Sequence, residues 1–439
     1  MATQRTVAFQ TLGCKLNFSE TSSIKRQFED HGYIAVPYSD PADIYILNTC
    51  SVTDFADRKC RKAVRSALKK NSDARVVVIG CYAQLKPEEI AQIEGVDLVL
   101  GATEKFNILN YIDDLSATTD RGMIKAGELR ELNTFNNAYS IGDRTRSFLK
   151  VQDGCDYKCT FCTIPQARGK SRSDSIDNIV KSAEVIAKAG VKEIVLTGVN
   201  IGDFGLIEKE GVRERSEGTF LELITALDKV EGVSRFRISS IEPNLCNDEI
   251  IEFVAQSEKF VPHFHMPLQS GSDKILKEMR RRYKSDLYVD RVQKIKSLKP
   301  HCCIGVDVIV GFPGETEAEF MTTYNFLKDL DISYLHVFTY SERNNTLAAV
   351  AEGTVPMEER RRRNQMLSIL SEKKKRQFYE QHLGTERSVL FEKSRRPGKM
   401  TGFTDNYVKI ETELKEEMIN FEDQKTLTSI NAEGLVSVV

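Results

Sequence analysis

The chain has 439 residues, 41% of them hydrophobic, and a formal net charge of -2. This length exceeds an ordinary single core and predicts roughly two to four domains. The apolar content and the lack of low-complexity tracts exclude a disordered chain, and no apolar run reaches the roughly 18 residues of a membrane-spanning helix. The first residues lack the basic-then-apolar plan of a signal peptide, so we expect a cytoplasmic protein with no membrane partner.

Residues 1–115 alternate short β-rich runs with helical patterns. The predicted strands are TVAFQTLG, DIYILNTC and ARVVVIGC, and the predicted helices between them are ETSSIKRQFEDHG and ADRKCRKAVRSALKK. This alternation predicts an α/β domain with a parallel sheet and crossover helices. The polar, poorly patterned residues 116–146 are predicted to be a linker.

Residues 147–356 repeat the strand-helix pattern six times. The strand candidates are SFLKVQDG, KEIVLTGVN, RFRISSIEP, HFHMPLQS, CIGVDVIVGF and ISYLHVFTYS. Six such units predict a partial (β/α)6 barrel, in which functional residues gather at the carboxyl ends of the strands. A basic connecting helix is predicted over residues 357–383, and residues 384–439 switch to short strands with turns, which predicts a small β-barrel.

Three cysteines follow the first barrel strand in the segment GCDYKCTFCTIP. Cys155, Cys159 and Cys162 have the spacing C-x3-C-x2-C, and in a reducing compartment such a cluster indicates a metal site rather than disulfides. Zinc would need a fourth, remote ligand, because no histidine lies between His31 and His263. An iron-sulfur cube accounts for the set of three, since three thiolates hold three irons and leave the fourth open to a small molecule.

With Phe161 before its third cysteine, at the end of the first strand of a six-unit barrel, this segment resembles the radical S-adenosylmethionine enzymes. The resemblance implies a [4Fe-4S] cluster whose open iron is chelated by S-adenosylmethionine, and reductive cleavage of that cofactor to a 5′-deoxyadenosyl radical. It also implies that residues around the cysteines and at later strand ends contact the cofactor. The candidates are Tyr157, Phe161, Thr197, Gly198, Asn200, Ser239, Glu242, Gln269, Ser270, Arg281, Gly311 and Pro313.

Three more cysteines, Cys14, Cys50 and Cys81, each end one predicted strand of the N-terminal domain. Their spacing matches no local metal motif, but the carboxyl ends of parallel strands converge on one crevice. The alternative for each is a buried cysteine that packs as a small hydrophobe, which is how we interpret Cys60. Three at equivalent strand ends, each beside Gly or Thr, favour a common site.

The motifs GCKLN, NTCSVT and GCYAQ, followed by CDYKCTFCTIP, resemble the methylthiotransferase family, which includes the MiaB, RimO and MtaB types. The resemblance covers the whole chain and implies a TRAM-like β-barrel at the C-terminus. It also implies an auxiliary [4Fe-4S] cluster on the three N-terminal cysteines. A sulfur species bound there accepts a methyl group from one S-adenosylmethionine, and the methylthio group then moves to the substrate carbon.

The run SVTDFADRKCRKAVR after Cys50 resembles the MtaB type, which acts on N6-threonylcarbamoyladenosine at position 37 of tRNA. The alternative substrates are isopentenyladenosine and a ribosomal-protein side chain, and the alternative class is a non-catalytic iron-sulfur protein that binds RNA or senses redox state. We expect an electron donor such as flavodoxin or ferredoxin and no stable protein partner. Candidate substrate contacts are Arg58, Lys59, Arg61, Arg168, Ser341 and Arg343.

The segment HVFTYSERNNTLAA differs from the family's usual HVFPYSxRxGTxA. It has Thr339 in the proline position and Asn345 in the glycine position, so we expect the turn there to differ. No residue stands out as a general acid or base.

Overall fold

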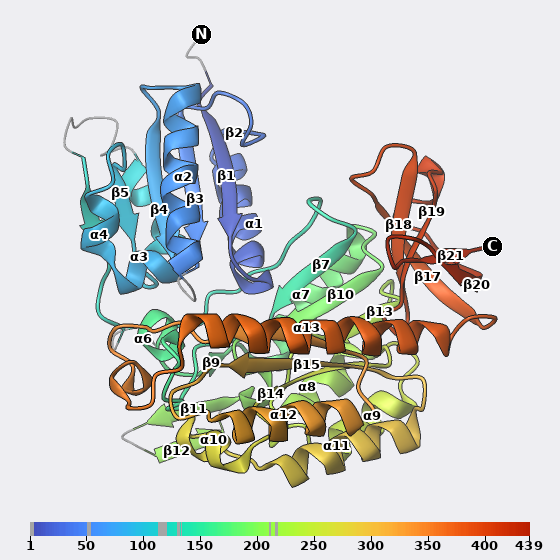
Figure 1. The fold of residues 1–439 in the computed structure, drawn as a ribbon. Coiled ribbons are helices and arrows are strands. Elements are labelled where there is room, and N and C mark those ends of the chain that lie inside the picture. Colours follow the sequence, from blue (N-terminus) through green and yellow to red (C-terminus); the bar gives the residue numbers. More distant parts are fainter. Residues whose placement is uncertain are drawn as a thin grey trace.

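The computed structural model describes residues 4–50, 54–112, 121–129, 132, 134–209, 212–215 and 218–439. Three parts are visible in Figure 1: a blue N-terminal α/β domain, a green-to-orange central barrel and a red C-terminal β-barrel. The first and last stand on the same side of the central barrel. Every helix in the described ranges is too short or too polar to span a lipid bilayer.

The N-terminal domain is a six-stranded parallel sheet with helices on both faces, as predicted. Its strands, in spatial order, are β2 (Ile34–Val36), β1 (Thr6–Leu12), β3 (Ile44–Thr49), β4 (Arg75–Gly80), β5 (Leu98–Leu100) and β6 (Met123–Lys125). Its helices are α1 (Lys15–Asp30), α2 (Asp54–Lys70), α3 (Cys81–Leu85), α4 (Pro87–Ala91) and the 3-10 turn η1 (Lys105–Asn107). Separate apolar clusters fill the two faces of the sheet. This double burial explains the near-continuous apolar runs of β3 and β4.

The predicted linker, residues 116–146, needs correction. Its residues Met123–Lys125 form strand β6 and pair in parallel with β5, so the N-terminal sheet extends into it. A three-residue strand is too short to show an alternating pattern, which explains the omission. Residues 116–120, 130, 131 and 133 of that segment lie outside the described residues.

The central domain contains six parallel strands in two adjoining sheets, ordered β13-β10-β7 and β14-β15-β16. A bridge between Phe236 and Phe260 and a hydrogen bond from the Ile241 amide to the His265 carbonyl (3.0 Å) join the two sheets. The partial barrel was therefore predicted correctly. The strands are β7 (Arg146–Lys150), β10 (Glu193–Thr197), β13 (Arg235–Ile238), β14 (His263–Gln269), β15 (Cys303–Val310) and β16 (Tyr334–Thr339).

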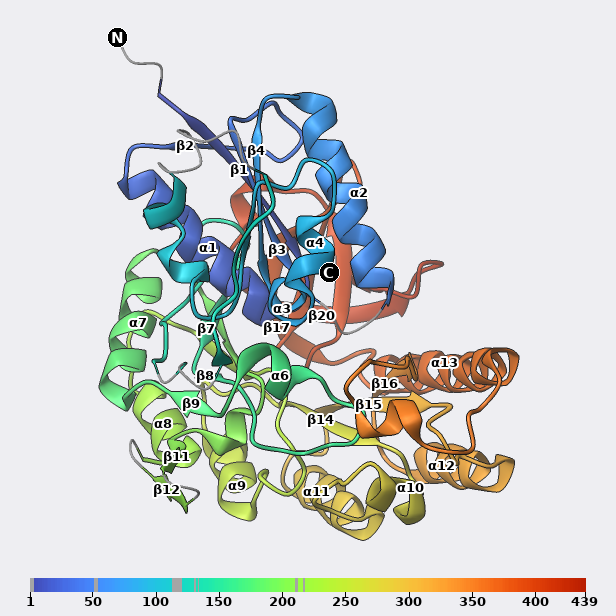
Figure 2. The ribbon, with the colours of Figure 1, turned by 90° about the vertical axis from the view of Figure 1, so that its left-hand side faces the viewer.

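Helices cover the outside of the barrel (Figures 1 and 2). They are α7 (Ile176–Lys188), α8 (Phe220–Leu227), α9 (Asp248–Gln256), α10 (Asp273–Glu278), α11 (Ser285–Leu298) and α12 (Glu317–Asp329), whereas α6 (Ile164–Arg168) lies between the barrel and the N-terminal domain. Short elements complete the domain: β8 (Gln152–Asp153), β9 (Arg172–Ser173), β11 (Leu206–Lys209), β12 (Val212–Arg215), η3 (Ile201–Asp203) and η4 (Leu347–Val350). Alternation along β15 sends Val306 and Val308 into the core beneath the helices and leaves Asp307 and Ile309 on the inner wall.

Helix α13 (Met357–Glu380) follows the barrel, close to the predicted bounds of 357–383. It is more than a connector, because it packs along β16. The Ser371 hydroxyl donates to the Leu335 carbonyl and accepts from the Leu335 amide, both at 2.9 Å. Arg363 is buried and pairs with Glu315 at 2.8 Å. Two of the arginines that make the helix look basic in sequence, Arg360 and Arg363, are therefore buried against the barrel.

The C-terminal module is a closed five-stranded barrel of order β17-β18-β19-β21-β20, as predicted. Its elements are β17 (Glu386–Lys393), β18 (Lys399–Thr404), β19 (Lys409–Glu413), η5 (Glu416–Met418), β20 (Glu422–Ile430) and β21 (Val436–Val438). Two arginines, Arg146 and the buried Arg235, join it to the central domain. Arg146 pairs with Glu392 (2.6 Å), and Arg235 pairs with Glu422 (2.9 Å) and donates to the Ser388 carbonyl (2.7 Å).

We predict that Arg235→Ala loosens the C-terminal barrel from the central domain. Arg235 is 2% exposed, so its removal leaves the Ser388 carbonyl without this donor, while Glu422 keeps its hydrogen bond from the Ser388 hydroxyl; we expect a cost of about 1–3 kcal/mol. Hydrogen exchange should accelerate in β17 and β20. Arg376→Ala removes an exposed pair with Glu380 and should leave the exchange rates unchanged. Unaltered exchange in Arg235→Ala would contradict this role.

Candidate functional site

The three N-terminal cysteines lie at one edge of the sheet. Leu12 pairs with Thr49 and Thr49 with Gly80, so β1, β3 and β4 end level with one another. Cys14, Cys50 and Cys81 follow these ends within one or two residues. A Cβ on Gly13 would lie 3.1 Å from the Cys50 Cβ, so a glycine here lets the two chains approach closely.

The second set occupies the loop between β8 and α6. Each sulfur accepts an N–H group: Cys155 from the Tyr157 amide (3.4 Å), Cys162 from the Ile164 amide (3.5 Å) and Cys159 from the Arg281 guanidinium (3.4 Å). Hydrogen bonds to sulfur are one of the means by which proteins tune iron-sulfur clusters.

Burial keeps these thiols protonated in the absence of a cation. It raises the pKa of Cys155 to about 12 and of Cys162 to about 11, and it also raises the pKa of Cys81 and Cys159. A nucleophilic cysteine has a depressed pKa instead. The thiols therefore fit a metal group, whose charge would stabilise the thiolates.

The spacing of the sulfur atoms distinguishes a cube from a single zinc ion. Tetrahedral zinc with bonds of about 2.3 Å sets its sulfur ligands about 3.8 Å apart. Over the part of the chain that the structure describes, neither cysteine set has all three sulfurs within 4.8 Å of one another. The wider spacing fits a cluster whose ligands bind three different irons.

A buried ion network lies between the two cysteine sets. Arg168, at the end of α6, binds Glu20 of α1 (3.0 Å), Asp153 of β8 (3.0 Å) and the Asn17 side-chain oxygen (2.7 Å). The same Asn17 oxygen accepts from the Cys14 thiol at 3.3 Å. Helices α3 and α6, which adjoin Cys81 and Cys162, pack against each other here (Figure 2).

Two lysines complete this network. Lys105 and Lys150 bind Glu20 at 2.7 and 3.4 Å. Although burial opposes it, the Arg168, Lys105 and Lys150 cations hold the pKa of Glu20 well below its usual range. Arg168 was predicted to contact substrate. It is instead buried, and it pairs with carboxylates at the interface of the two domains.

Several predicted cofactor contacts surround the second cysteine set. Arg281 forms an ion pair with Glu242, and the buried Tyr157 accepts a hydrogen bond from Asn244 at 2.8 Å. Phe161 lies edge-on to Phe312, with the ring centres 6.5 Å apart. The structure thus brings Tyr157, Glu242 and Arg281 to the cysteine loop, where their contact with cofactor stays a prediction.

Gln152 was missed in the sequence. Its side-chain oxygen accepts from the Val199 and Asn200 amides at 3.0 and 2.8 Å, while its nitrogen donates to the Gly154 carbonyl at 2.7 Å. It thereby ties the Gly198–Asn200 turn to the cysteine loop. Asn200 is buried, and its side-chain oxygen has no hydrogen-bond partner among the residues that the structure describes. Gln152 gave no signal in the sequence, because it is an ordinary strand residue directly before Asp153.

Two predicted contacts are corrected. The Thr197 hydroxyl is buried and donates to the Leu149 carbonyl (3.1 Å), and Ser270 is fully buried against Thr323 (3.1 Å). Both are therefore engaged within the protein. Ser239 is partly exposed at its strand end, Gly311 adopts a left-handed φ of 78°, and Pro313 lines a hollow beside Thr160 of the cysteine loop.

A pocket of about 220 Å³ adjoins the cysteine loop and extends down the barrel wall. The predicted substrate contacts Ser341 and Arg343 line it together with Cys162, Gln269 and Asp307. Asn345 adopts the left-handed φ of 67°, the conformation that glycine adopts readily. Asn345 thus takes a conformation that the family's glycine could share, and the expected difference in the turn stays a prediction.

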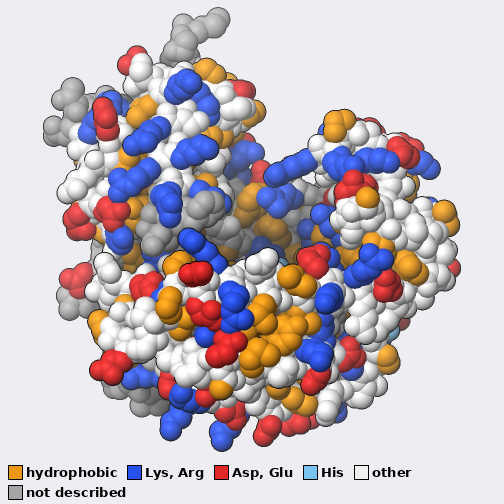
Figure 3. All heavy atoms as spheres, in the orientation of Figure 1, with side chains coloured by type: hydrophobic (Ala, Val, Ile, Leu, Met, Phe, Trp, Pro, Cys, Tyr) orange, Lys and Arg blue, Asp and Glu red, His pale blue; other side chains and the backbone are white. Residues whose placement is uncertain are grey.

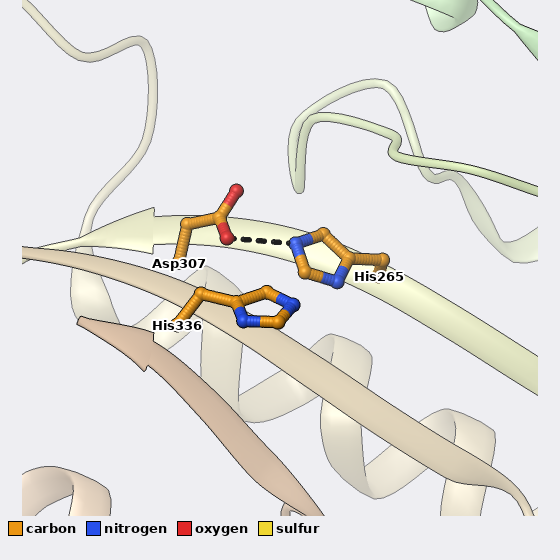
Figure 4. A group of neighbouring side chains, drawn as sticks. All are labelled: His265, Asp307 and His336. Carbon is orange, nitrogen blue, oxygen red and sulfur yellow. Dashed lines mark ion pairs between the residues drawn. The ribbon is translucent and has the colours of Figure 1, made fainter. Parts of the chain in front are cut away.

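The inner wall of the barrel carries a second missed group: His265, Asp307 and His336, on three neighbouring strands (Figure 4). His265 Nε2 lies 2.9 Å from Asp307 Oδ1. Its signal in the sequence is polar residues at alternate positions of otherwise apolar strands, which indicates an inner wall that is not packed as core.

Basic side chains gather on α2 and beside the hollow between the N-terminal domain and the C-terminal barrel (Figure 3). Arg58 and Lys59 are exposed on α2, whereas Arg61 pairs with Glu89 at 2.8 Å. Residues 51–53, which begin the run that favoured the MtaB type, lie outside the described residues.

We predict that Glu20→Gln destabilises the junction of the two domains. The change removes the carboxylate that the three cations Arg168, Lys105 and Lys150 share, which costs about 3–5 kcal/mol. The midpoint of urea unfolding should fall, while Glu29→Gln, on an exposed part of the same helix, should leave it unchanged.

The stabilisation that Glu20 contributes through its cations depends on pH. Because the folded-state pKa of Glu20 is depressed, its contribution is complete above the unfolded pKa of about 4.3 and is lost as the pH falls below it. The stability difference between the natural protein and Glu20→Gln should therefore shrink below about pH 4. A difference that stays constant down to pH 3 would exclude this interaction as its source.

Comparison with known proteins gives family matches in the N-terminal domain and in the central domain. Residues 149–327 match the radical SAM superfamily, and residues 6–101 match the uncharacterized protein family UPF0004. One solved structure with a similar fold is the radical S-adenosylmethionine methyltransferase TsrM from Kitasatospora setae, with a TM-score of 0.60 and 12% identity, covering 79% of this chain and 75% of that one.

Curated relatives match nearly the full length. The threonylcarbamoyladenosine tRNA methylthiotransferase MtaB of Bacillus subtilis is 41% identical over 94% of this chain and 92% of its own. The protein of that name from Aquifex aeolicus is 39% identical over 93% and 96%. A tRNA-2-methylthio-N(6)-dimethylallyladenosine synthase from Akkermansia muciniphila is 32% identical over 83% of both chains.

Proposed function

Since this chain belongs to the MtaB type of radical S-adenosylmethionine methylthiotransferases, we propose that it replaces the C2 hydrogen of N6-threonylcarbamoyladenosine in tRNA with a methylthio group. The observation that carries the proposal is the pair of three-cysteine sets facing each other across the Arg168 network. One set lies in the single loop between β8 and α6, and the other lies at the ends of three strands of the N-terminal sheet.

Each set of cysteines would hold one [4Fe-4S] cluster. When bound, the cluster on Cys155, Cys159 and Cys162 supplies the electron that cleaves S-adenosylmethionine, and the cluster on Cys14, Cys50 and Cys81 presents the sulfur. Arg281 holds Glu242 beside Cys159, and Gln152 fixes the Gly198–Asn200 turn over the same loop. These side chains would bind the polar groups of the cofactor at the open side of the first cluster.

The hollow between the N-terminal domain and the C-terminal barrel suits an RNA stem (Figure 3). Helix α2 carries exposed cations, among them Arg58, Lys59 and Lys62, that would meet RNA phosphates. Arg144 is exposed, and its guanidinium carbon lies 4.6 Å from the ring centre of Phe18 in α1. We assign phosphate binding to these residues and the target adenosine to the pocket lined by Ser341 and Arg343.

The reaction consumes an electron that the chain itself does not supply. A flavodoxin or a ferredoxin fits this need as donor, because each is a small one-electron carrier. With tRNA as substrate, the cytoplasm is the compartment that we propose.

We predict about eight iron atoms per chain after anaerobic reconstitution. Replacing Cys14, Cys50 and Cys81 by Ala together should lower this to about four and abolish methylthio transfer while 5′-deoxyadenosine still forms. The matching triple variant at Cys155, Cys159 and Cys162 should also hold about four irons but form no 5′-deoxyadenosine.

Cys60→Ala is the control for this experiment, because Cys60 is buried in the apolar core of the N-terminal domain. It should keep the full iron content. Full-length protein that saturates at about four irons would contradict the two-cluster proposal.

Mass spectrometry of tRNA nucleosides tests the substrate. Deleting the gene from its host should remove 2-methylthio-N6-threonylcarbamoyladenosine and leave its unmethylthiolated precursor, and purified enzyme should restore the product. Loss of 2-methylthio-isopentenyladenosine instead would favour the second substrate, which is the one named in the 32% identical relatives.

A further inference from the structure

The group formed by His265, Asp307 and His336 has no role in the function described so far. Its side chains come from the middle of β14, β15 and β16, and their ligand atoms lie within 4.8 Å of one another (Figure 4). Asp307 is directly opposite His336 in the strand register. The group therefore forms one polar spot on the inner wall of the barrel.

A hydrogen-bonded chain behind His265 fixes its orientation. His265 Nε2 faces Asp307, His265 Nδ1 lies 3.3 Å from the Tyr334 hydroxyl, and that hydroxyl lies 3.1 Å from His263 Nε2. With its proton on Nε2, a neutral His265 ring accepts from Tyr334 through Nδ1, and Tyr334 accepts from His263. Burial raises the pKa of Tyr334 far above its ordinary value, so the phenol keeps its proton.

Toward the pocket, the group has unused hydrogen-bonding capacity. The His336 side chain is exposed and makes no hydrogen bond to any of the described residues. His265 is the one partner of the Asp307 carboxylate among the same residues, and the other carboxylate oxygen points away from both rings in Figure 4. The next inward residue of β16, Phe338, is 51% exposed. An apolar ring beside open polar groups is the usual composition of a ligand pocket.

The position of the group matches a substituent on the target base. Asp307 and Cys162 line the same pocket, and Asp307 precedes the end of β15 at Val310 by about 10 Å of strand. In adenine, C2 and the carbon that carries N6 both flank N1. If C2 of the base lies beside the cysteine sets, its N6 substituent can therefore extend along the pocket to Asp307.

The charges around the group suit an anion that also carries N–H and O–H groups. Partial burial, His265 and the Lys15 ammonium lower the pKa of His336, while Asp307 raises it. In its neutral form the ring offers one N–H donor. Lys15 belongs to the N-terminal domain, directly after Cys14. The imidazole and the ammonium complement a carboxylate, and Asp307 accepts from N–H or O–H.

We infer that His265, Asp307 and His336 form the binding site for the substituent on N6 of the adenosine, an amino acid joined through a urea. The inference rests on the proposed function and goes further, because it assigns the choice between substrates to these side chains. An isopentenyl group would leave the His336 imidazole and the second carboxylate oxygen of Asp307 without a hydrogen-bond partner from the substrate. Sites built to hydrogen-bond a substrate reject analogues without the matching groups by roughly 10⁴-fold.

Binding to anticodon stem-loop RNA tests this inference. Fluorescence anisotropy compares one stem-loop with threonylcarbamoyl at N6 of adenosine 37 and one with plain adenosine, on reconstituted full-length protein. The natural protein should prefer the modified stem-loop. His336→Phe should lose at least about tenfold affinity for the modified RNA while binding plain RNA as before.

Two further variants sharpen the test. His336→Gln keeps a side-chain N–H and should recover part of the preference, which a merely structural role of the ring would not produce. His31→Phe, on an exposed histidine of the N-terminal domain, should behave as the natural protein.

Three outcomes would overturn the inference. The first is an equal loss of affinity for both RNAs in His336→Phe. The second is an unchanged preference in both His336→Phe and Asp307→Asn. The third is one equivalent of zinc or manganese held by cluster-free protein and lost in Asp307→Asn, which would make the group a cation site. The proposed function fails by a different result, namely natural protein that forms no methylthiolated threonylcarbamoyladenosine.

Discussion

The buried ion pair between Arg168 and Glu20 is the contact on which the site depends. The cysteine sets belong to separate domains, and chemistry between them requires a fixed separation. Arg168 ends the helix that follows Cys162, and Glu20 lies in the helix that follows Cys14. A buried pair of this kind tolerates little displacement, because any separation leaves a charge without water or a partner. The network thus fixes the geometry between two reaction centres that no single strand spans.

The inner wall of the barrel shows a second constraint. A closed barrel of this size fills its interior with side chains. Here the six strands form an incomplete ring, and β15 and β16 turn Asp307, His336 and Phe338 toward open space. Polar residues on this wall would destabilise a packed core, so their presence agrees with an interior reserved for cofactor and substrate.

Much of this organisation could be predicted from the sequence because strand runs and helix periodicity repeat clearly. The three-part plan and the approximate bounds of α13 follow from such local patterns. Convergence of Cys14, Cys50 and Cys81 also followed from a general rule, since parallel strands end at one edge. Strand β6 was missed, because three residues carry no periodicity.

The errors at the site have a common physical origin. In the sequence, a charged residue near a motif suggests a contact with a ligand. Only the folded structure shows which protein group it actually pairs with. Arg168 finds Glu20 across 148 positions, and Thr197 finds a carbonyl 48 positions away. Gln152 and His265 were overlooked for the same reason, since each works through contacts that have no local signature.

Helix α13 has 24 residues, or about 36 Å of rigid rod. Near its start Arg360 donates to the Tyr340 carbonyl beside the substrate pocket, and near its end Tyr379 accepts from the Lys409 amide of the C-terminal barrel. The helix therefore holds the pocket beside Tyr340 and the C-terminal barrel at a fixed separation. Any substrate that touched both parts would have to match the length of this rod.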